Sequence, residues 1–148
     1  MSLDTLPGEL YSAIIEHLPE DDYQYTTASL ICTLPYAPIP RHHLYKIIRI
    51  RRPQQTVACY LHLRKVKNKF DTNINDGSCP LTWIQVLRIE EWTVDGDVAL
   101  NLVSMLPRAY LNSFNIWIGA NNFTPEHLEE MFENPFDKVA KLGIRFRP

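Results

Sequence analysis

The side chains that could bind a metal or perform catalysis are few in this sequence, and their spacing does not suit either task. His42 and His43 are adjacent, whereas two histidine ligands on one helix face need a spacing of three or four residues. No cysteine or carboxylate lies near this pair in the sequence. We therefore expect both histidines to be surface residues beside Arg41, with no metal bound.

Sequence motifs of enzymes are also absent. The chain has no nucleophile elbow, no H-E-x-x-H and no Gly-rich phosphate loop, and its five glycines do not cluster. Cys32, Cys59 and Cys79 are odd in number and widely spaced, which argues against a disulfide framework and a cysteine-based zinc site. We expect reduced thiols, with Cys32 and Cys59 packed as small hydrophobes. The sequence predicts a protein that is not an enzyme and has no cofactor.

Charge is strongly segregated along the chain. Residues 1–40 hold six acids and no Lys or Arg, residues 41–69 hold nine Lys or Arg and no acid, and residues 70–148 hold eleven acids and six bases. Tyr45 and Tyr60 lie within the basic segment, which makes phosphate binding an alternative to consider. The pI near 6.2 and the acidic flanks argue against nucleic acid as the partner. Such blocks usually mark surfaces that face different neighbours.

The first 50 residues predict three short helical segments and a strand. An apolar residue recurs every four positions from Leu6 to Leu18, which places a stripe on one face of the first helix. Pro19 ends this helix, and a second is expected from about Asp22 to Leu34. A helical turn near 41–45 then leads into a strand, where Ile48 and Ile50 alternate with arginines.

The remaining residues predict strand–helix units that repeat. The expected elements are a helix at 54–70, a loop at 71–80, strands at 83–92, 111–118 and 139–146, and helices at 95–106 and 124–135. Leu87, Phe114 and Leu142 occupy corresponding positions 27 and 28 residues apart, within the range of leucine-rich repeats. The consensus asparagine and most leucines are missing, so a plain α/β sheet remains the alternative. Both alternatives give parallel strands joined by helices.

Taken together, residues 6–50 resemble the F-box. The family opens with Leu-Pro-x-Glu-aliphatic, and this chain has LPGEL at 6–10. Asp22-Tyr23 begins the second helix, and Leu30-Ile31-Cys32 stands where the family often has Val-Cys-Arg/Lys. The segment Leu44-Tyr45-Lys46-x-Ile48-x-Ile50 is similar to the family's Leu-Trp-Arg-x-Ile-x-Leu ending. The resemblance covers nearly a third of the chain.

Two positions depart from the family pattern. The aromatic residue commonly found after the Cys-Arg/Lys pair is replaced by Leu34-Pro35, and Tyr45 takes the place of the terminal tryptophan. Both replacements keep apolar bulk, so they bear on affinity more than on membership of the family. The order of an F-box followed by leucine-rich-like repeats is also familiar in this family, and the chain is similar to fungal examples.

The resemblance implies an α/β chain with a three-helix F-box at 3–46 and leucine-rich-repeat-like units with parallel strands at 47–148. In the family, the F-box packs on a Skp-type adaptor, which is held by a cullin scaffold. The residues carried over to that contact are Leu6, Pro7, Leu10, Ile14, Leu18 and Tyr23, with Leu30 and Leu34 shared with the module's own core. A unit of about 40 residues cannot bury its whole apolar stripe on itself, so the remainder invites a partner. The alternative is that this stripe packs against the chain's own repeats.

The resemblance also implies that the repeats gather a substrate protein on their sheet. Trp117 is in opposite register to Ile116 and Ile118, which predicts that it lies on the face away from the core, and Trp92 comes at a strand end. Exposed aromatic side chains are good anchors for a partner, so Trp117 and Trp92 are predicted to bind the substrate. The chain is then expected to recruit substrates to a cullin-RING ubiquitin ligase. The alternative function is a repeat-type interaction scaffold with no ligase link.

Two further expectations concern the cellular setting and the ends of the chain. The N-terminus lacks a basic secretory segment, and no apolar run reaches the roughly 18–20 residues that span a bilayer, so we expect a cytoplasmic or nuclear protein with no membrane contact. The sequence stops directly after a predicted strand. A fragment, a truncated gene product and a protein that needs a partner are three open explanations.

Overall fold

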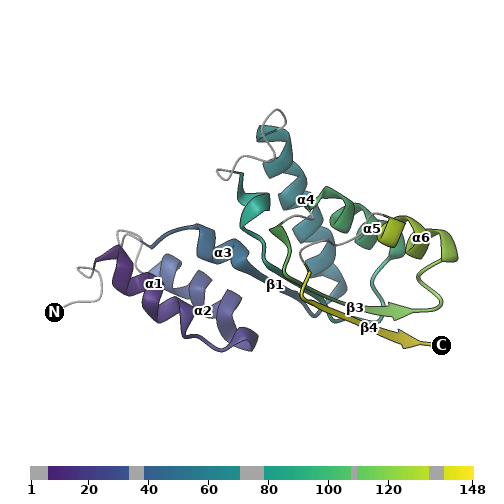
Figure 1. Cartoon of the computed structure of the whole chain (residues 1–148), viewed down its shortest axis with the longest axis horizontal. Helices are drawn as coiled ribbons and strands as arrows, with labels where there is room; N and C mark the ends of the chain where they lie inside the picture. The colour runs from purple at the N-terminus through teal and green to yellow at the C-terminus, as the bar shows by residue number, and fades with distance from the viewer. Residues whose placement is uncertain (1–6, 34–38, 71–78, 108–109, 134–138) are drawn as a thin grey trace.

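The computed structural model describes residues 7–33, 39–70, 79–107, 110–133 and 139–148, and the statements below concern these residues. Three helices come first, and strands and helices then alternate (Figure 1). The elements are α1 (Gly8–Glu16), α2 (Glu20–Thr33), α3 (His42–Lys46), β1 (Ile47–Ile50), α4 (Pro53–Lys69), the 3-10 helix η2 (Pro80–Trp83), β2 (Val86–Ile89), α5 (Gly96–Met105), β3 (Ser113–Gly119), α6 (Pro125–Glu133) and β4 (Lys141–Arg147). Most of the predicted loop at 71–80 lies outside the described residues.

The four strands form one parallel sheet in the order β1-β2-β3-β4, so each strand lies beside its predecessor in the chain. The helices α4, α5 and α6 connect consecutive strands and lie together on one face of the sheet (Figure 1). The pairing register aligns Ile48, Leu87, Phe114 and Leu142 in one row across the sheet. The predicted α/β class and the parallel strands are therefore confirmed, and the 27- and 28-residue spacing corresponds to register positions in adjacent strands.

The core lies between the sheet and these three helices. Alternate strand residues face the helices because successive side chains in a strand point to opposite sides. The buried strand residues on this face are Ile48, Ile50, Leu87, Ile89, Phe114, Ile116 and Ile118. Ala99, Leu102 and Val103 of α5 belong to the same cluster. The predicted inward positions of β1, β2 and β3 are all confirmed.

Local capping explains where α5 and α6 begin. The Asp95 carboxylate accepts hydrogen bonds from the backbone N–H groups of Asp97 (2.9 Å) and Val98 (3.2 Å). At α6, the His127 N–H donates to Thr124 Oγ1 (3.2 Å), and the Thr124 N–H donates to His127 Nδ1 (3.0 Å). These two reciprocal bonds satisfy the backbone N–H groups of Thr124 and His127. They lie at the helix start that was expected at Thr124.

The prediction for the buried side of α4 was partly wrong. Val57 and Leu61 were expected to face the core, yet they are 46% and 49% exposed. The stripe that packs inward contains Thr56 and Leu63, which are buried, and the partly buried Cys59 and Val66. Local apolar periodicity did not distinguish these two neighbouring stripes, because the choice depends on where the sheet and α5 lie.

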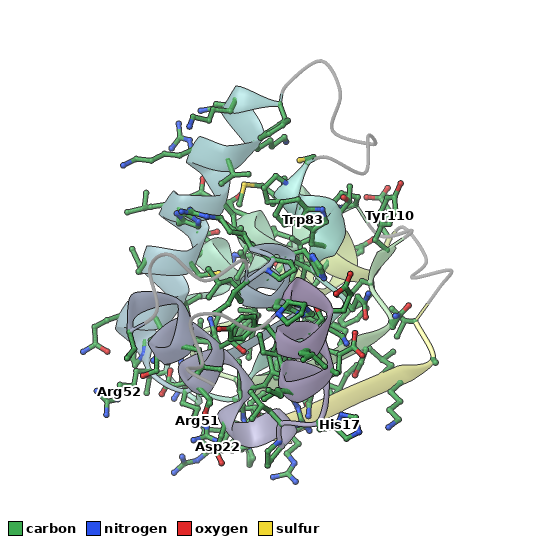
Figure 2. The ribbon with its side chains drawn as sticks, turned by 90° about the vertical axis from the view of Figure 1, so that its left-hand side faces the viewer. His17, Asp22, Arg51, Arg52, Trp83 and Tyr110 are labelled. Carbon is green, nitrogen blue, oxygen red and sulfur yellow. The ribbon has the colours of Figure 1, made fainter. Side chains whose placement is uncertain are left out.

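The N-terminal helical unit, which we define as α1–α3, is joined closely to the sheet. Helix α3 ends at Lys46, and β1 begins at the next residue. The backbone N–H of Arg49 donates to Gln24 Oε1 of α2 (3.2 Å), so a side chain of this unit caps the outer edge of β1. Trp83 of η2 meets Tyr45 edge-on, with ring centroids 5.6 Å apart. Figure 2 shows Trp83 well away from Arg51 and Arg52, which lie together at the bottom of the view.

Leu87 and Leu142 provide a matched test of this fold, because they share a register row but differ in burial. We expect Leu87→Ala to lower the free energy of unfolding by roughly 2–5 kcal/mol, because it leaves a cavity in a fully packed core. The exposed Leu142→Ala should cost less than about 1 kcal/mol. Urea unfolding followed by circular dichroism measures both. Equal losses would contradict the one-sided core.

Candidate functional site

Helix α1 is apolar on two sides. Tyr11 and Ile15 face inward and are almost fully buried, with exposed fractions of 2% and 0%. Leu10 and Ile14 lie one position earlier in each turn and are 48% and 45% exposed. We call these two residues the α1 outer face. Since residues four apart lie on the same side of a helix, the outer face is a continuous apolar strip that the described part of the chain leaves open.

The remaining predicted adaptor-contact residues divide into three groups. Pro7 is exposed, and Leu18 and Leu30 are half-buried, which agrees with a surface or shared position. Leu6 and Leu34 lie outside the described residues. Tyr23 requires a correction, because it is buried and cannot present its ring to a partner without rearrangement. It packs in the interior of the helical unit, where its hydroxyl lies 3.1 Å from His43 Nδ1.

His43 connects all three helices of the unit and is itself buried. Its Nε2 lies 3.0 Å from Ser12 Oγ of α1, and its Nδ1 binds the Tyr23 hydroxyl of α2. Either neutral tautomer of His43 can make both bonds, because the ring donates to one hydroxyl and accepts from the other. The predicted surface position of His43 was therefore wrong, whereas His42 is exposed as expected.

Electrostatics keep this buried contact neutral. Burial lowers the pKa of His43, and the adjacent His42 lowers it further. Burial also raises the pKa of Tyr23 to about 12, to which the Glu16 carboxylate adds. Both shifts favour the uncharged forms near neutral pH, because charged groups lose hydration when they are buried. Tyr23 and His43 therefore join the helices through hydrogen bonds, and they do not form an acid–base pair at a surface.

A second group of side chains lies on the sheet face opposite the core. Trp117 is on this face, as its register predicted, but Trp117 and Trp92 are half-buried rather than exposed. The two rings pack against each other with centroids 4.9 Å apart. The guanidinium of Arg145 lies 5.3 Å from the centroid of the Trp117 ring, and that of Arg147 lies 5.9 Å from the centroid of Trp92. These are cation–π distances. We call these four residues the Trp–Arg patch.

The two halves of this sheet face differ in charge. On β1 and β2, Arg49 Nε lies 2.5 Å from Glu90 Oε1, and Arg88 lies 3.7 Å from the same oxygen. Arg145 and Arg147 on β4 form no ion pair with a described carboxylate and are stacked on indole rings instead. The positive charge of the face that is not offset by an acid is therefore concentrated along β4.

The basic segment supplies side chains to a groove and to the exposed side of α4. Arg41, Arg49 and Arg51 line a groove of ≈ 740 Å³ between the helical unit and α4, and Ile48 and Leu63 contribute to its apolar part. Arg64, Lys65 and Lys69 are exposed on α4, and Lys67 is half-buried. Cys59 also lines the groove, and burial raises the pKa of its thiol to about 11. The thiol is therefore protonated and unreactive near neutral pH.

Comparison of the chain with models of protein families, with curated proteins and with solved structures finds no match. No helix in the described part of the chain is long and apolar enough to cross a membrane. Among the described residues, no group of three or more His, Cys, Asp or Glu side chains is arranged to hold a metal ion. Among the described residues, the α1 outer face and the Trp–Arg patch are therefore the candidate binding surfaces.

The pKa shift of His43 predicts a pH-dependent stability. The unfolded chain takes up a proton near pH 6.5, whereas folded His43 does so only at lower pH. The free energy of unfolding should therefore fall as the pH drops from about 7 towards the lowered pKa. Thermal unfolding at pH 7.5 and 5.5 measures this effect. The His43→Gln variant, which cannot titrate there, should lose less stability between these two pH values. An identical pH dependence in both proteins would rule out this contribution.

Proposed function

We propose that this chain is an F-box-type adaptor that links a target protein to a cullin-RING ubiquitin ligase. The α1 outer face is the observation that carries the proposal. Leu10 and Ile14 belong to the F-box-like stripe, and both remain about half exposed while the same helix is already anchored by Tyr11 and Ile15. The helix can therefore bind a partner through its outer face without losing its own packing.

The chemistry of the outer face suits a helical partner such as a Skp-type adaptor. Two branched apolar side chains four residues apart form a ridge that packs into the groove of another helix. Completing the burial of each contributes roughly 1 kcal/mol at about 25 cal/mol per Å². Pro7 extends the ridge, and the half-buried Leu18 follows α1, so the contact can be longer than these two residues.

The junction between the helical unit and the sheet supports a bridging role. A ligase adaptor must hold its target in a defined position relative to the partner that it binds. Here α3 leads directly into β1, the Gln24 side chain caps the β1 edge, and Trp83 packs on Tyr45. These contacts make the helical unit and the sheet one continuous structure, so a partner on α1 and a target on the sheet would be held at a fixed separation.

The target would bind at the sheet face that carries the Trp–Arg patch. Tryptophan and arginine are the side chains most enriched at the energetic centres of protein interfaces. In this role the chain performs no bond-making chemistry, and the protonated thiol of Cys59 and the neutral histidine network fit that role. The alternative, a repeat-type scaffold with no ligase link, would use the same patch but leave the α1 outer face without an adaptor.

The proposal predicts that the full chain co-elutes with a Skp-type adaptor after co-expression. The Leu10→Ala/Ile14→Ala variant should weaken this complex at least roughly tenfold, because it removes most of the exposed apolar surface of the ridge. Alanine keeps the helix intact, since it has the highest helix propensity. Size-exclusion chromatography and titration calorimetry measure the loss.

Val57→Ala/Leu61→Ala provides a matched control. These residues lie on one side of α4 and are exposed to nearly the same extent as Leu10 and Ile14, so the substitutions remove similar apolar surface elsewhere. We expect this variant to bind the adaptor like the wild type. A folded wild-type chain that does not co-elute would overturn the ligase proposal and favour the scaffold alternative. Equal weakening by both variants would show that the contact does not use α1.

A further inference from the structure

The outward backbone groups at the two edges of the sheet differ in their hydrogen-bond partners. At β1, the outward N–H groups of Arg49 and Arg51 donate to the side-chain oxygens of Gln24 (3.2 Å) and Gln55 (2.8 Å). At the other edge, Lys141 donates its N–H to Asn112 of the β3 side, and Arg147 accepts from the Ala120 N–H. Since alternate residues of a parallel strand bond to the same neighbour, the odd-numbered residues of β4 face β3. The N–H and C=O groups of the even-numbered residues point away from the sheet.

These even-numbered residues also carry exposed apolar side chains. Leu142, Ile144 and Phe146 are 53%, 37% and 66% exposed, although their register partners Phe114, Ile116 and Ile118 are buried. They lie on the helix side of the sheet, beyond the area that α6 covers. Outward backbone groups and uncovered apolar side chains thus coincide at the same three residues, which is the arrangement that an added strand would complete.

On the opposite side of β4, positively charged side chains recur with the same two-residue spacing as the apolar ones. Arg145 and Arg147 are two residues apart, so they repeat at the distance of alternate side chains in an extended chain, about 6.6–6.8 Å. Each guanidinium lies over an indole ring of the Trp–Arg patch, and its N–H groups at the ring's edge can still donate to a carboxylate. Residues paired across two strands place their side chains on the same face.

We propose that β4 binds an extended peptide segment in which acidic and apolar residues alternate. The segment adds as a fifth strand and bonds to the outward backbone groups of Leu142, Ile144 and Phe146. Its apolar residues cover these three side chains, and its carboxylates pair with Arg145 and Arg147. This inference rests on the proposed function in that it names the class of target segment that the repeats hold.

A second copy of the chain fits this edge less well. If the β4 strands of two copies paired antiparallel about Ile144, Lys141 of each copy would lie directly opposite Arg147 of the other. Like charges at directly opposed positions destabilise a pair of strands. Basic residues on an edge strand also protect it from self-association. The charge pattern of β4 therefore selects an acidic strand in preference to itself.

Fluorescence polarisation with labelled eight-residue peptides tests the proposal on the full chain. The probe alternates glutamate and valine. One control peptide has four glutamates followed by four valines, and another replaces every glutamate with lysine. We expect the alternating acidic probe to bind at least roughly tenfold more tightly than either control, because the block peptide breaks the two-residue period and the lysine peptide opposes the arginines. Equal binding of all three peptides overturns the proposal.

Charge reversal on β4 makes the test specific for this edge. Arg145→Glu/Arg147→Glu should bind the acidic probe roughly tenfold more weakly and the lysine probe more tightly than the wild type does. The matched control Arg51→Glu/Arg64→Glu, which changes two exposed arginines elsewhere, should retain the wild-type preference. If the β4 reversal does not fold by circular dichroism, Phe146→Ala serves instead and should weaken the acidic probe several-fold. An unchanged preference in the folded β4 variant overturns the proposal.

Two further results separate this inference from the proposed function. Leu10→Ala/Ile14→Ala should bind the alternating probe like the wild type, because the helical unit contacts the β1 edge of the sheet, whereas β4 forms the other edge. Adaptor co-elution without peptide binding leaves the proposed function standing and overturns the β4 proposal. Peptide binding without adaptor co-elution supports the β4 proposal and overturns the proposed ligase link. A concentration-dependent dimer in sedimentation, with no peptide binding, identifies a second copy as the occupant and also overturns the proposal.

Discussion

A parallel sheet whose strands follow one another in chain order has its crossover helices on one face, because the connections share one handedness. This constraint governs the arrangement of β1–β4 and of α4, α5 and α6. It builds the core between the sheet and α4–α6, and it leaves the opposite face and both outer edges for other uses. At the β1 edge, Gln24 of the helical unit accepts a hydrogen bond from the Arg49 N–H. The opposite face carries the Trp–Arg patch, and the edge at β4 presents outward backbone groups.

Charge distinguishes the surfaces that this arrangement leaves accessible. Glu90 forms ion pairs with both Arg49 of β1 and Arg88 of β2, so the arginines of that part of the sheet face have a carboxylate partner. On β4 the arginines stack on Trp117 and Trp92 instead. An arginine on an indole is held in a defined orientation while its donors remain available, which suits recognition of a carboxylate. The open edge is thus also the most positive part of this face among the described residues.

The helical unit is subject to a different constraint, which is that three short helices cannot bury all of their apolar surface. Its interior depends on Tyr11 and Ile15 and on the neutral contact between Tyr23 and His43. A buried polar pair is tolerated when both partners are hydrogen-bonded, and Ser12 completes the set. Since these residues anchor α1 from within, its outer face is not needed for folding. The unit can therefore offer an apolar ridge to a partner without depending on it for stability.

The order and type of the helices and strands, apart from η2, and the register of β2, β3 and β4 could be predicted from the sequence alone. Alternation along β1, β2 and β3 and the spacing of Leu87, Phe114 and Leu142 depend on local geometry, so both could be predicted. The face occupied by Trp117 followed from the same two-residue period. Which of two adjacent apolar stripes is covered depends on how the elements pack against one another. This packing buried Tyr11 rather than Leu10 on α1, and it exposed Leu61 on α4.

Tertiary structure also placed His43 in the interior and set Arg147 over Trp92. No local pattern marks these positions, because burial and ring stacking depend on segments that are distant in the sequence. Periodicity tells how side chains are arranged around one helix or strand. Only the packing of that element against its neighbours determines which of its sides meets solvent.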